Sequence, residues 1–168
     1  MRSKYVILHI LFLIAGCSYY SVSGSLPGHI KTAAVPLFEN ETTETQLVED
    51  VTEAVVDAII ANGSMKVVGE FQADAVVNGT IIDVIDEADE YSRDEVAEQF
   101  RIRIIAHVSF YDRVKNRVIW EEERLEGWAR YEASGSSVSE ESVSREEGKK
   151  KALDMLAKEI IDKTVAGW

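Results

Sequence analysis

Cysteine, histidine and proline are scarce in this sequence of 168 residues, and each scarcity excludes a class of protein. The single cysteine excludes an internal disulfide framework, and with only three histidines it also excludes a zinc finger or ribbon. Two prolines and a hydrophobic content of 46% argue against a disordered chain. The length is typical of one domain with one ordinary core.

Basic residues are also few relative to acidic ones. Eighteen lysines and arginines stand against thirty aspartates and glutamates, which gives a net charge of −12. Such a chain is repelled by polyanions, so we expect no nucleic-acid partner and no broad attraction to an anionic membrane. Any anion that the protein binds must therefore be held by a small local cluster of basic residues.

Catalytic motifs are missing from the sequence. It contains no G-x-S-x-G elbow, P-loop, G-x-G-x-x-G or H-E-x-x-H pattern, and neither His29 nor His107 accompanies a nucleophile motif. We therefore expect no enzymatic activity and no cofactor. The acidic segment 83–95 offers carboxylate oxygens for a cation, but it lacks the spacing and the central glycine of a calcium loop. We predict a solvated loop there and no metal site.

The first sixteen residues have the organisation of a secretory signal peptide. Arg2 and Lys4 precede an apolar run, residues 5–14, of about ten residues, which is too short for a membrane-spanning helix. The run leads into Ile14-Ala15-Gly16-Cys17, which resembles the lipobox of bacterial lipoproteins. We predict cleavage after residue 16 and a covalent lipid on Cys17 that anchors the chain in a membrane.

The residues after Cys17 predict the location and the organisation of the mature chain. Ser18 stands where an aspartate often retains such proteins at the inner membrane, so we predict an outer-membrane protein that faces the periplasm. Residues 17–28 are expected to be a tether and residues 29–168 a single domain. Cleavage removes two basic residues and no acid, which changes the net charge from −12 to −14.

Four segments have the apolar patterns of β-strands. The clearest is 100–111, where apolar and polar residues alternate, and residues 112–116 are a predicted turn before its hairpin partner. Pro36 places the first strand at an edge of the sheet or ends it there. The predicted strands are 30–38, 75–85, 100–111 and 118–128, with an acidic loop at 86–98.

Two segments have the pattern of amphipathic helices. Apolar residues recur every three or four positions in 47–59, Thr43 and Gln46 have capping-box spacing, and Gly63 ends the helix. Ser144 and Glu147 have the same spacing before a second helix that ends near residue 167. The order of elements predicts an α+β fold, a two-layer sandwich with two helices packed on one face of a four-stranded mixed sheet.

Five basic residues stand out against the acidic background. Arg113, Lys115 and Arg117 fall at the predicted hairpin turn, while Arg101 and Arg103 project from one face of the strand before it. Such a cluster is suited to a phosphate group, although solubility alone also favours charges at a turn and on an open sheet face. His107 has the same facing as the two arginines, and we expect a surface or hydrogen-bonded histidine.

Several short stretches, taken in order, carry a resemblance to a known family. They are Cys17 with Tyr19-Tyr20, the segments 23–27 and 30–40, Ala73-Asp74-Ala75 with Asn78-Gly79-Thr80-Ile81, and residues 108–112 before Trp120. Together they resemble the LptE family of lipopolysaccharide-assembly lipoproteins, and the resemblance spans essentially the whole chain.

The resemblance implies a role without catalysis. A protein of this kind is anchored in the inner leaflet of the outer membrane, plugs the large β-barrel LptD, helps the barrel to assemble, and contacts lipopolysaccharide on its way to the cell surface. The expected partners are thus an LptD-like barrel, lipopolysaccharide and the leaflet. The family's basic contact residues have no motif that aligns here, so chemistry alone makes these residues the candidate lipopolysaccharide contacts: Arg101, Arg103, Arg113, Lys115 and Arg117.

A second hypothesis remains open from the residues alone. An outer-membrane lipoprotein with a small α+β domain also suits a binding partner of a periplasmic enzyme or of a secretion pore, such as an activator of a peptidoglycan synthase.

Overall fold

The computed structural model describes residues 26–91, 97–132 and 143–166. The predicted signal peptide, the predicted lipidation site Cys17 and most of the predicted tether lie outside these described residues. Within the described part of the chain, no helix is both long enough and apolar enough to cross a membrane.

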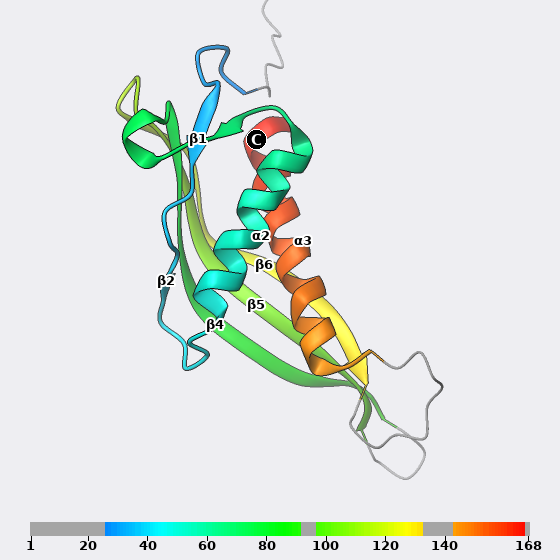
Figure 1. Ribbon diagram of the computed structural model, residues 1–168. Coiled ribbons are helices and arrows are strands. Elements are labelled where there is room, and N and C mark those ends of the chain that lie inside the picture. Colours follow the sequence, from blue (N-terminus) through cyan, green and yellow to red (C-terminus); the bar gives the residue numbers. More distant parts are fainter. Residues whose placement is uncertain (1–25, 92–96, 133–142, 167–168) are drawn as a thin grey trace, which may run out of the picture.

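The described chain forms one mixed sheet and two long helices (Figure 1). The strands lie in the order β3-β1-β4-β5-β6, and β2 pairs with β4 further along that strand than β1 does. The short strands pair in parallel, whereas β4, β5 and β6 form a long antiparallel meander. In chain order the elements are β1 (Thr32–Ala34), β2 (Glu39–Asn40), α2 (Leu47–Asn62), β3 (Lys66–Val67), the 3-10 turn η1 (Glu70–Gln72), β4 (Ala75–Tyr91), β5 (Ala97–Asp112), β6 (Arg117–Glu132) and α3 (Arg145–Ala166).

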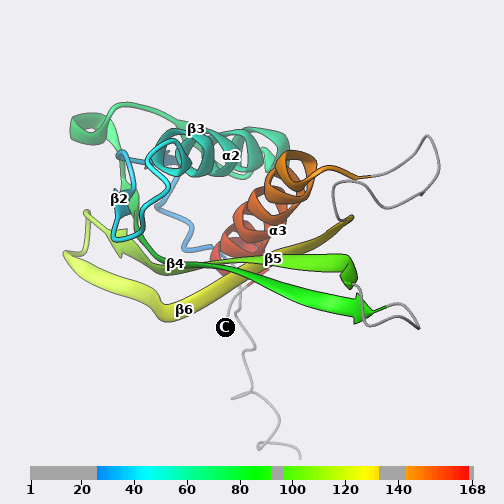
Figure 2. The same ribbon diagram turned by 90° about the horizontal axis from the view of Figure 1, so that it is seen from below.

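Both helices cover the same face of the sheet, which confirms the predicted two-layer α+β sandwich (Figure 2). The sheet has six strands and not four. Only β1 forms within the predicted first strand, 30–38, which ends before Pro36 as expected, while β2 begins just beyond it at Glu39 and β3 has only two residues. Strands this short carry no periodic signal, so a pattern-based count misses them.

The predicted acidic loop at 86–98 is wrong over most of its length. Strand β4 continues to Tyr91 and β5 begins at Ala97, so only residues 92–96 between them are outside the description. The charged residues of this part of β4 hide the apolar pattern that identifies a strand, because its open face is polar. Glu87 and Asp89 pair with arginines of β5 and β6, and Asp86 pairs with Arg145 at the start of the helix that follows β6, which offsets the repulsion among these acids.

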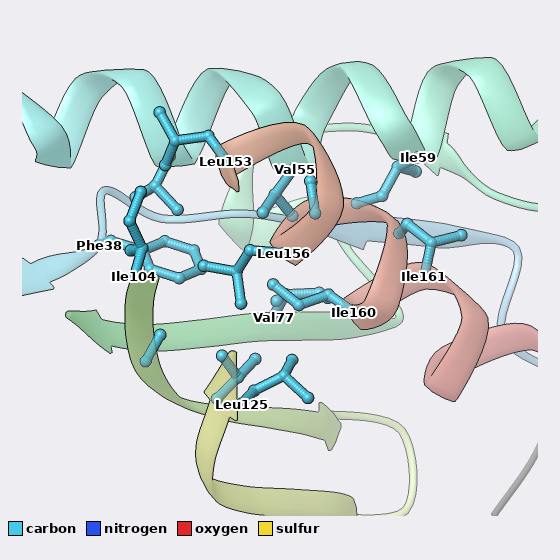
Figure 3. Packing of buried hydrophobic residues seen from close by; sticks show 14 of the residues in the cluster. Phe38, Val55, Ile59, Val77, Ile104, Leu125, Leu153, Leu156, Ile160 and Ile161 are labelled. Atoms are coloured by element: carbon cyan, nitrogen blue, oxygen red, sulfur yellow. The ribbon is translucent and has the colours of Figure 1, made fainter. Parts of the chain in front are cut away.

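The core lies between the helices and one face of the meander. Alternate residues of β5 from Ile102 to Phe110 are fully buried there, and the residues between them are polar and lie on the open face, except for Ile105, which is 1% exposed. Figure 3 shows side chains from both helices and from the sheet gathered in this layer. The fully buried contributions of the helices include Val55 and Ile59 of α2 and Leu156 and Ile160 of α3.

Two glycines permit close packing over the sheet. A Cβ atom on Gly127 of β6 would lie 2.1 Å from the carbonyl oxygen of Ala152 and 2.6 Å from Cβ of Leu156, so the backbone of α3 passes directly over this strand. A Cβ atom on Gly79 of β4 would lie 1.9 Å from the ring of Phe38. The contact at Gly127 sets the distance between α3 and the sheet, and the contact at Gly79 allows the Phe38 ring, just before β2, to pack against β4.

The helix ends agree only in part with the capping predictions. Ser144 and Glu147 form the predicted capping box, with the backbone N–H of Ser144 donating to the Glu147 carboxylate at 2.9 Å and the Glu147 N–H donating to Oγ of Ser144 at 3.3 Å. The capping box at Thr43 is wrong, because the N-cap residue of α2 is Gln46 and its side chain makes no capping bond. The predicted stop is confirmed, since Gly63 adopts a left-handed conformation with φ of 71°.

Candidate functional site

The turn between β5 and β6 is organised by a buried carboxylate. The side chain of Asp112 is 0% exposed, accepts a hydrogen bond from the Lys115 backbone N–H at 2.9 Å, and bonds with Nε2 of His29 at 2.8 Å. Burial acts to raise the pKa of Asp112, but these hydrogen bonds outweigh it and hold the pKa below its ordinary value. Asn116, with φ of 53°, completes the turn. The predicted turn at 112–116 is thus confirmed.

A second carboxylate fastens β1 to the segment before β4. Asp74 Oδ2 accepts hydrogen bonds of 2.9 Å from the backbone N–H groups of Lys31 and Thr32 and from the Thr32 hydroxyl. The backbone bond from Lys31 contributes most to lowering the pKa of Asp74, and the Thr32 hydroxyl follows. This anchoring gives the Ala73-Asp74-Ala75 stretch a structural role. The Asp74 carboxylate accepts the backbone hydrogen bonds of Lys31 and Thr32 at the point where β1 and β4 begin.

Arg113 joins the hairpin turn to η1. Its backbone N–H donates to the carbonyl of Asp74 at 2.9 Å, and its guanidinium donates to the carbonyl of Glu70. Strand β1, turn η1 and the hairpin tip therefore form one connected end of the domain. We call this end the basic end and define it by seven exposed residues: Lys31, Lys66, Phe71, Arg113, Val114, Lys115 and Arg117.

The basic end has more positive than negative side chains. Among the described residues, none of its five bases forms an ion pair with an acid; the nearby Asp74 and Asp112 are occupied by hydrogen bonds within the fold, whereas Glu70 of η1 is exposed beside these bases. Arg113, Lys115 and Arg117 lie on one turn, as the sequence predicts, and Lys31 and Lys66 were not among the candidates. Register alone brings those two lysines here, because Thr32 of β1 pairs with Lys66 of β3.

The other two candidate contacts lie far from this end and already have acidic partners. Arg103 makes a two-pronged bond to Glu126, at 2.7 and 2.8 Å, and lies 3.6 Å from Glu87. The bond to Glu126 raises the pKa of Arg103, and the same bond lowers the pKa of Glu126. Arg101 pairs with Asp89 at 2.5 Å.

Stacking reinforces the Arg101 pair. Its guanidinium lies over the ring of Trp128, 5.0 Å from the centroid, while Arg130 shares the carboxylate of Asp89. Arg101 and Arg113 are twelve positions apart on an extended strand, about 40 Å at roughly 3.3 Å per residue. The five predicted contacts therefore form two separate groups, and only the group at the hairpin tip is free of ion pairs among the described residues.

Other side chains with potential chemistry are accounted for by local structure. His107 lies on the open face of the sheet as predicted, with Nε2 2.9 Å from a carboxylate oxygen of Glu121. Arg145, at the start of α3, bonds to Glu44 at 2.6 Å and to Asp86 at 2.7 Å, and these bonds raise its pKa. The described residues contain no group of three or more potential ligands that could hold a metal ion.

Besides the two lysines, sequence reasoning missed the aromatic residue of the basic end. Phe71, in η1, is 95% exposed, although phenylalanine is usually a core residue. In the sequence, Phe71 is an isolated aromatic residue that belongs to no periodic pattern of apolar residues. Such a residue is recognised as a surface residue only once the fold is known.

Comparisons with known proteins agree with the architecture. The family model described as LptE, lipopolysaccharide-assembly, matches residues 30–164. No curated protein matches the chain. Similar solved structures include the hypothetical protein CT253 from Chlamydia trachomatis, with 13% identity, 80% of this chain and 95% of that chain covered, and a TM-score of 0.55.

Two further solved structures are similar over most of their length. A minor lipoprotein from Acinetobacter baumannii is 15% identical, with coverage of 82% and 92% and a TM-score of 0.52. The PelC dodecamer from Paraburkholderia phytofirmans is 13% identical, with coverage of 86% and 96% and a TM-score of 0.51. At these identities the likeness concerns the fold alone.

Proposed function

The chain belongs to the LptE lipopolysaccharide-assembly family, and on that premise we propose that it is an outer-membrane lipoprotein that plugs and helps assemble an LptD-like β-barrel for lipopolysaccharide transport. The lipid on Cys17 anchors it in the inner leaflet of the outer membrane, facing the periplasm. The observation that carries the proposal is the family match, which extends from the segment before β1 into the last turn of α3. The role requires binding surfaces and no catalysis.

The construction of the sheet suits a plug. A plug has to keep its shape against a surrounding wall, and the long meander is braced by ion pairs across its open face, such as Arg103 with Glu126 and Arg130 with Asp89. Gly127 brings α3 into direct backbone contact with the opposite face. A polar, internally paired face is also compatible with the polar interior of a large barrel.

We place the lipopolysaccharide contact at the hairpin tip. Arg113, Lys115 and Arg117 are exposed and have no acidic partner among the described residues, so they can bind phosphate without breaking an ion pair. Recruitment of Arg103 would leave the Glu126 carboxylate unpaired, which opposes binding. Arg101 and Arg103 are therefore assigned to bracing the sheet, within the same proposal.

The overall role is tested by purification and depletion. The tagged full-length chain, extracted from cell envelopes with mild detergent, is expected to copurify with an LptD-like barrel. Depletion is expected to leave that barrel immature and to reduce lipopolysaccharide at the cell surface. Copurification of a peptidoglycan synthase without the barrel would favour the alternative hypothesis. Normal barrel maturation and normal surface lipopolysaccharide after depletion would refute the proposal.

The contact residues are tested by charge reversal. The double variant Lys115→Glu/Arg117→Glu is expected to reduce photocrosslinking to lipopolysaccharide about tenfold, because two phosphate-binding charges become repulsive. Lys151→Glu/Lys158→Glu on the exposed side of α3 changes the net charge equally and serves as the control. Both variants should keep the wild-type melting temperature within a few degrees. Equal crosslinking by the two variants would remove the hairpin tip from the contact.

The anchor is tested separately. Cys17→Ala is expected to move the protein out of the membrane fraction after a carbonate wash. Retention of this variant in the membrane would indicate an uncleaved apolar helix in place of a lipid.

A further inference from the structure

The basic end exposes apolar as well as basic side chains. Phe71 is 95%, Val114 60% and Val118 48% exposed, on or beside two turns that Arg113 bonds to each other. Figure 1 shows η1 and the β5–β6 turn side by side at the end of the sheet where β1 begins. Single exposed apolar residues are common, but three at one end among five bases form an amphipathic surface.

Packing does not account for the position of Phe71. The segment that carries it is held by the Arg113 guanidinium on the Glu70 carbonyl and by the hydrogen bonds of Asp74, and the ring itself contributes almost nothing to the core. A fixed turn that presents a bare aromatic ring to solvent loses the favourable burial of that ring. A partner with an apolar layer would recover it.

The chain enters the domain at this same end. His29, three residues after the first described residue Leu26, bonds to Asp112 of the hairpin turn. Cys17 precedes Leu26 by nine residues, which span at most about 30 Å when fully extended. A bilayer that holds the lipid on Cys17 is therefore within about 30 Å of the entry point of the domain.

We propose that the basic end is a membrane-contact surface, in which Phe71 and Val114 enter the interfacial layer of the leaflet while Arg113, Lys115 and Arg117 contact lipid phosphates. The proposal rests on the lipid anchor of the proposed function. Aromatic rings and basic side chains are the combination that partitions to this depth, because the rings favour the apolar boundary and the cations favour phosphate.

Charge distribution supports this orientation. The cleaved, lipidated chain of this proposal carries a net charge of −14, which is −12 less the two bases of residues 1–16, so a membrane with anionic lipids repels most of its surface. The start of α2, with Glu49 and Asp50 exposed in its first turn, lies at the opposite end of the helix from β1 and β3. Contact through the basic end keeps these acids away from the headgroups and presents the locally positive surface to them.

Phospholipid and lipopolysaccharide share phosphate chemistry, so the three cations that the proposed function assigns to lipopolysaccharide contact the phospholipid leaflet in this inference while no lipopolysaccharide is bound, and phospholipid is the probe. The full-length lipidated protein is reconstituted in vesicles of phosphatidylethanolamine and phosphatidylglycerol that contain no lipopolysaccharide. Because Cys17 is the only cysteine and carries the lipid in this proposal, Val114→Cys provides a single free thiol for an environment-sensitive fluorophore. Glu49→Cys, exposed at the far end, is the matched control.

The label at position 114 is expected to shift to the blue and to be quenched by brominated lipids, whereas the label at position 49 stays in water. Adding Lys115→Gln or Arg117→Gln should reduce the membrane-contact equilibrium constant about fivefold each, the effect of roughly one basic side chain near an anionic surface. Phe71→Ser should reduce it about tenfold, because a buried aromatic ring is removed.

Three results would overturn the inference. The first is a lipidated, vesicle-bound protein whose label at position 114 reports water. The second is quenching only in vesicles that also contain lipopolysaccharide, which would assign the surface to that ligand. The third is a photocrosslinker at position 71 that captures the barrel or a second copy in cells in place of lipid. If mass spectrometry detects no lipid on Cys17 and the protein fails to float with vesicles, the anchor itself is refuted, and this inference with it.

Discussion

Replacing Gly127 with alanine should separate helix α3 from the sheet. The added Cβ atom would meet the Ala152 carbonyl oxygen at 2.1 Å, Cβ of Leu156 at 2.6 Å and the Leu156 backbone nitrogen at 2.7 Å. Two of these three atoms belong to the helix backbone, so no side-chain rotation relieves the clash. The helix would have to move by about 1 Å, against a core packed at the density of an organic crystal.

The expected cost is at the upper end of the range for overpacking, about 3 kcal/mol. With a urea m-value of about 2 kcal/mol/M, the midpoint of unfolding should fall by about 1.5 M while the m-value stays constant. Gly69→Ala is the matched control, because its φ is −64° and a Cβ atom there meets nothing within 4 Å. That variant should be unchanged or slightly more stable. A Gly127→Ala midpoint within 0.3 M of wild type, roughly 0.5 kcal/mol, would refute the close helix–strand contact.

Two further predictions concern charged and capping groups. Asp112→Asn should destabilise the domain by about 2 kcal/mol at neutral pH, because the buried carboxylate loses its charge-assisted bond to His29. The folded-state pKa of Asp112 lies below its unfolded value of about 4, so its contribution is present above that pH and is lost as the pH falls through the folded pKa. Urea midpoints between pH 7 and pH 3 should accordingly fall less steeply for the variant than for wild type, and parallel curves would contradict this assignment. Ser144→Ala should cost about 1 kcal/mol by removing the N-cap of α3, measured by the same titration, and an unchanged midpoint would contradict the capping box.

The fold class could be predicted from the periodicity of apolar residues because the long strands and helices follow that periodicity. Apart from the buried Ile105, strand β5 alternates between a face that meets the helices and a polar face, and α3 begins at a capping box that is recognisable in the sequence. The last six residues of β4, 86–91, were not predicted as strand because their acids resemble a solvated loop. Their basic partners include Arg101 on the adjacent strand β5 and Arg130 on β6 beyond it, and only the strand register brings them together.

The candidate site was predictable only in its local part. Three bases within five residues at a turn are visible in the sequence, and the structure keeps them together. Lys31 and Lys66 join them through parallel pairing of strands of two or three residues, for which no sequence pattern exists. Conversely, the spacing of Arg101 and Arg103 is compatible with a binding face, but the guanidinium of Arg103 already donates two hydrogen bonds to the Glu126 carboxylate.

An acidic protein is expected to repel an acidic lipid. Ion pairs within the protein and screening by salt limit this repulsion, so that the charges close to the contact decide its sign. The Debye length at physiological salt is about 8 Å, so acids at the far end of a meander about 40 Å away contribute little at the hairpin tip. Near the far end, Asp89 and Glu126 are themselves paired with arginines. At the tip, Asp112 is buried beneath the turn and bonded to His29, so it offers no competing ion pair to Lys115 or Arg117. The sign of the surface at the hairpin tip thus depends on which carboxylates are already hydrogen-bonded or ion-paired within the fold. The net charge of the chain is a poor guide to it.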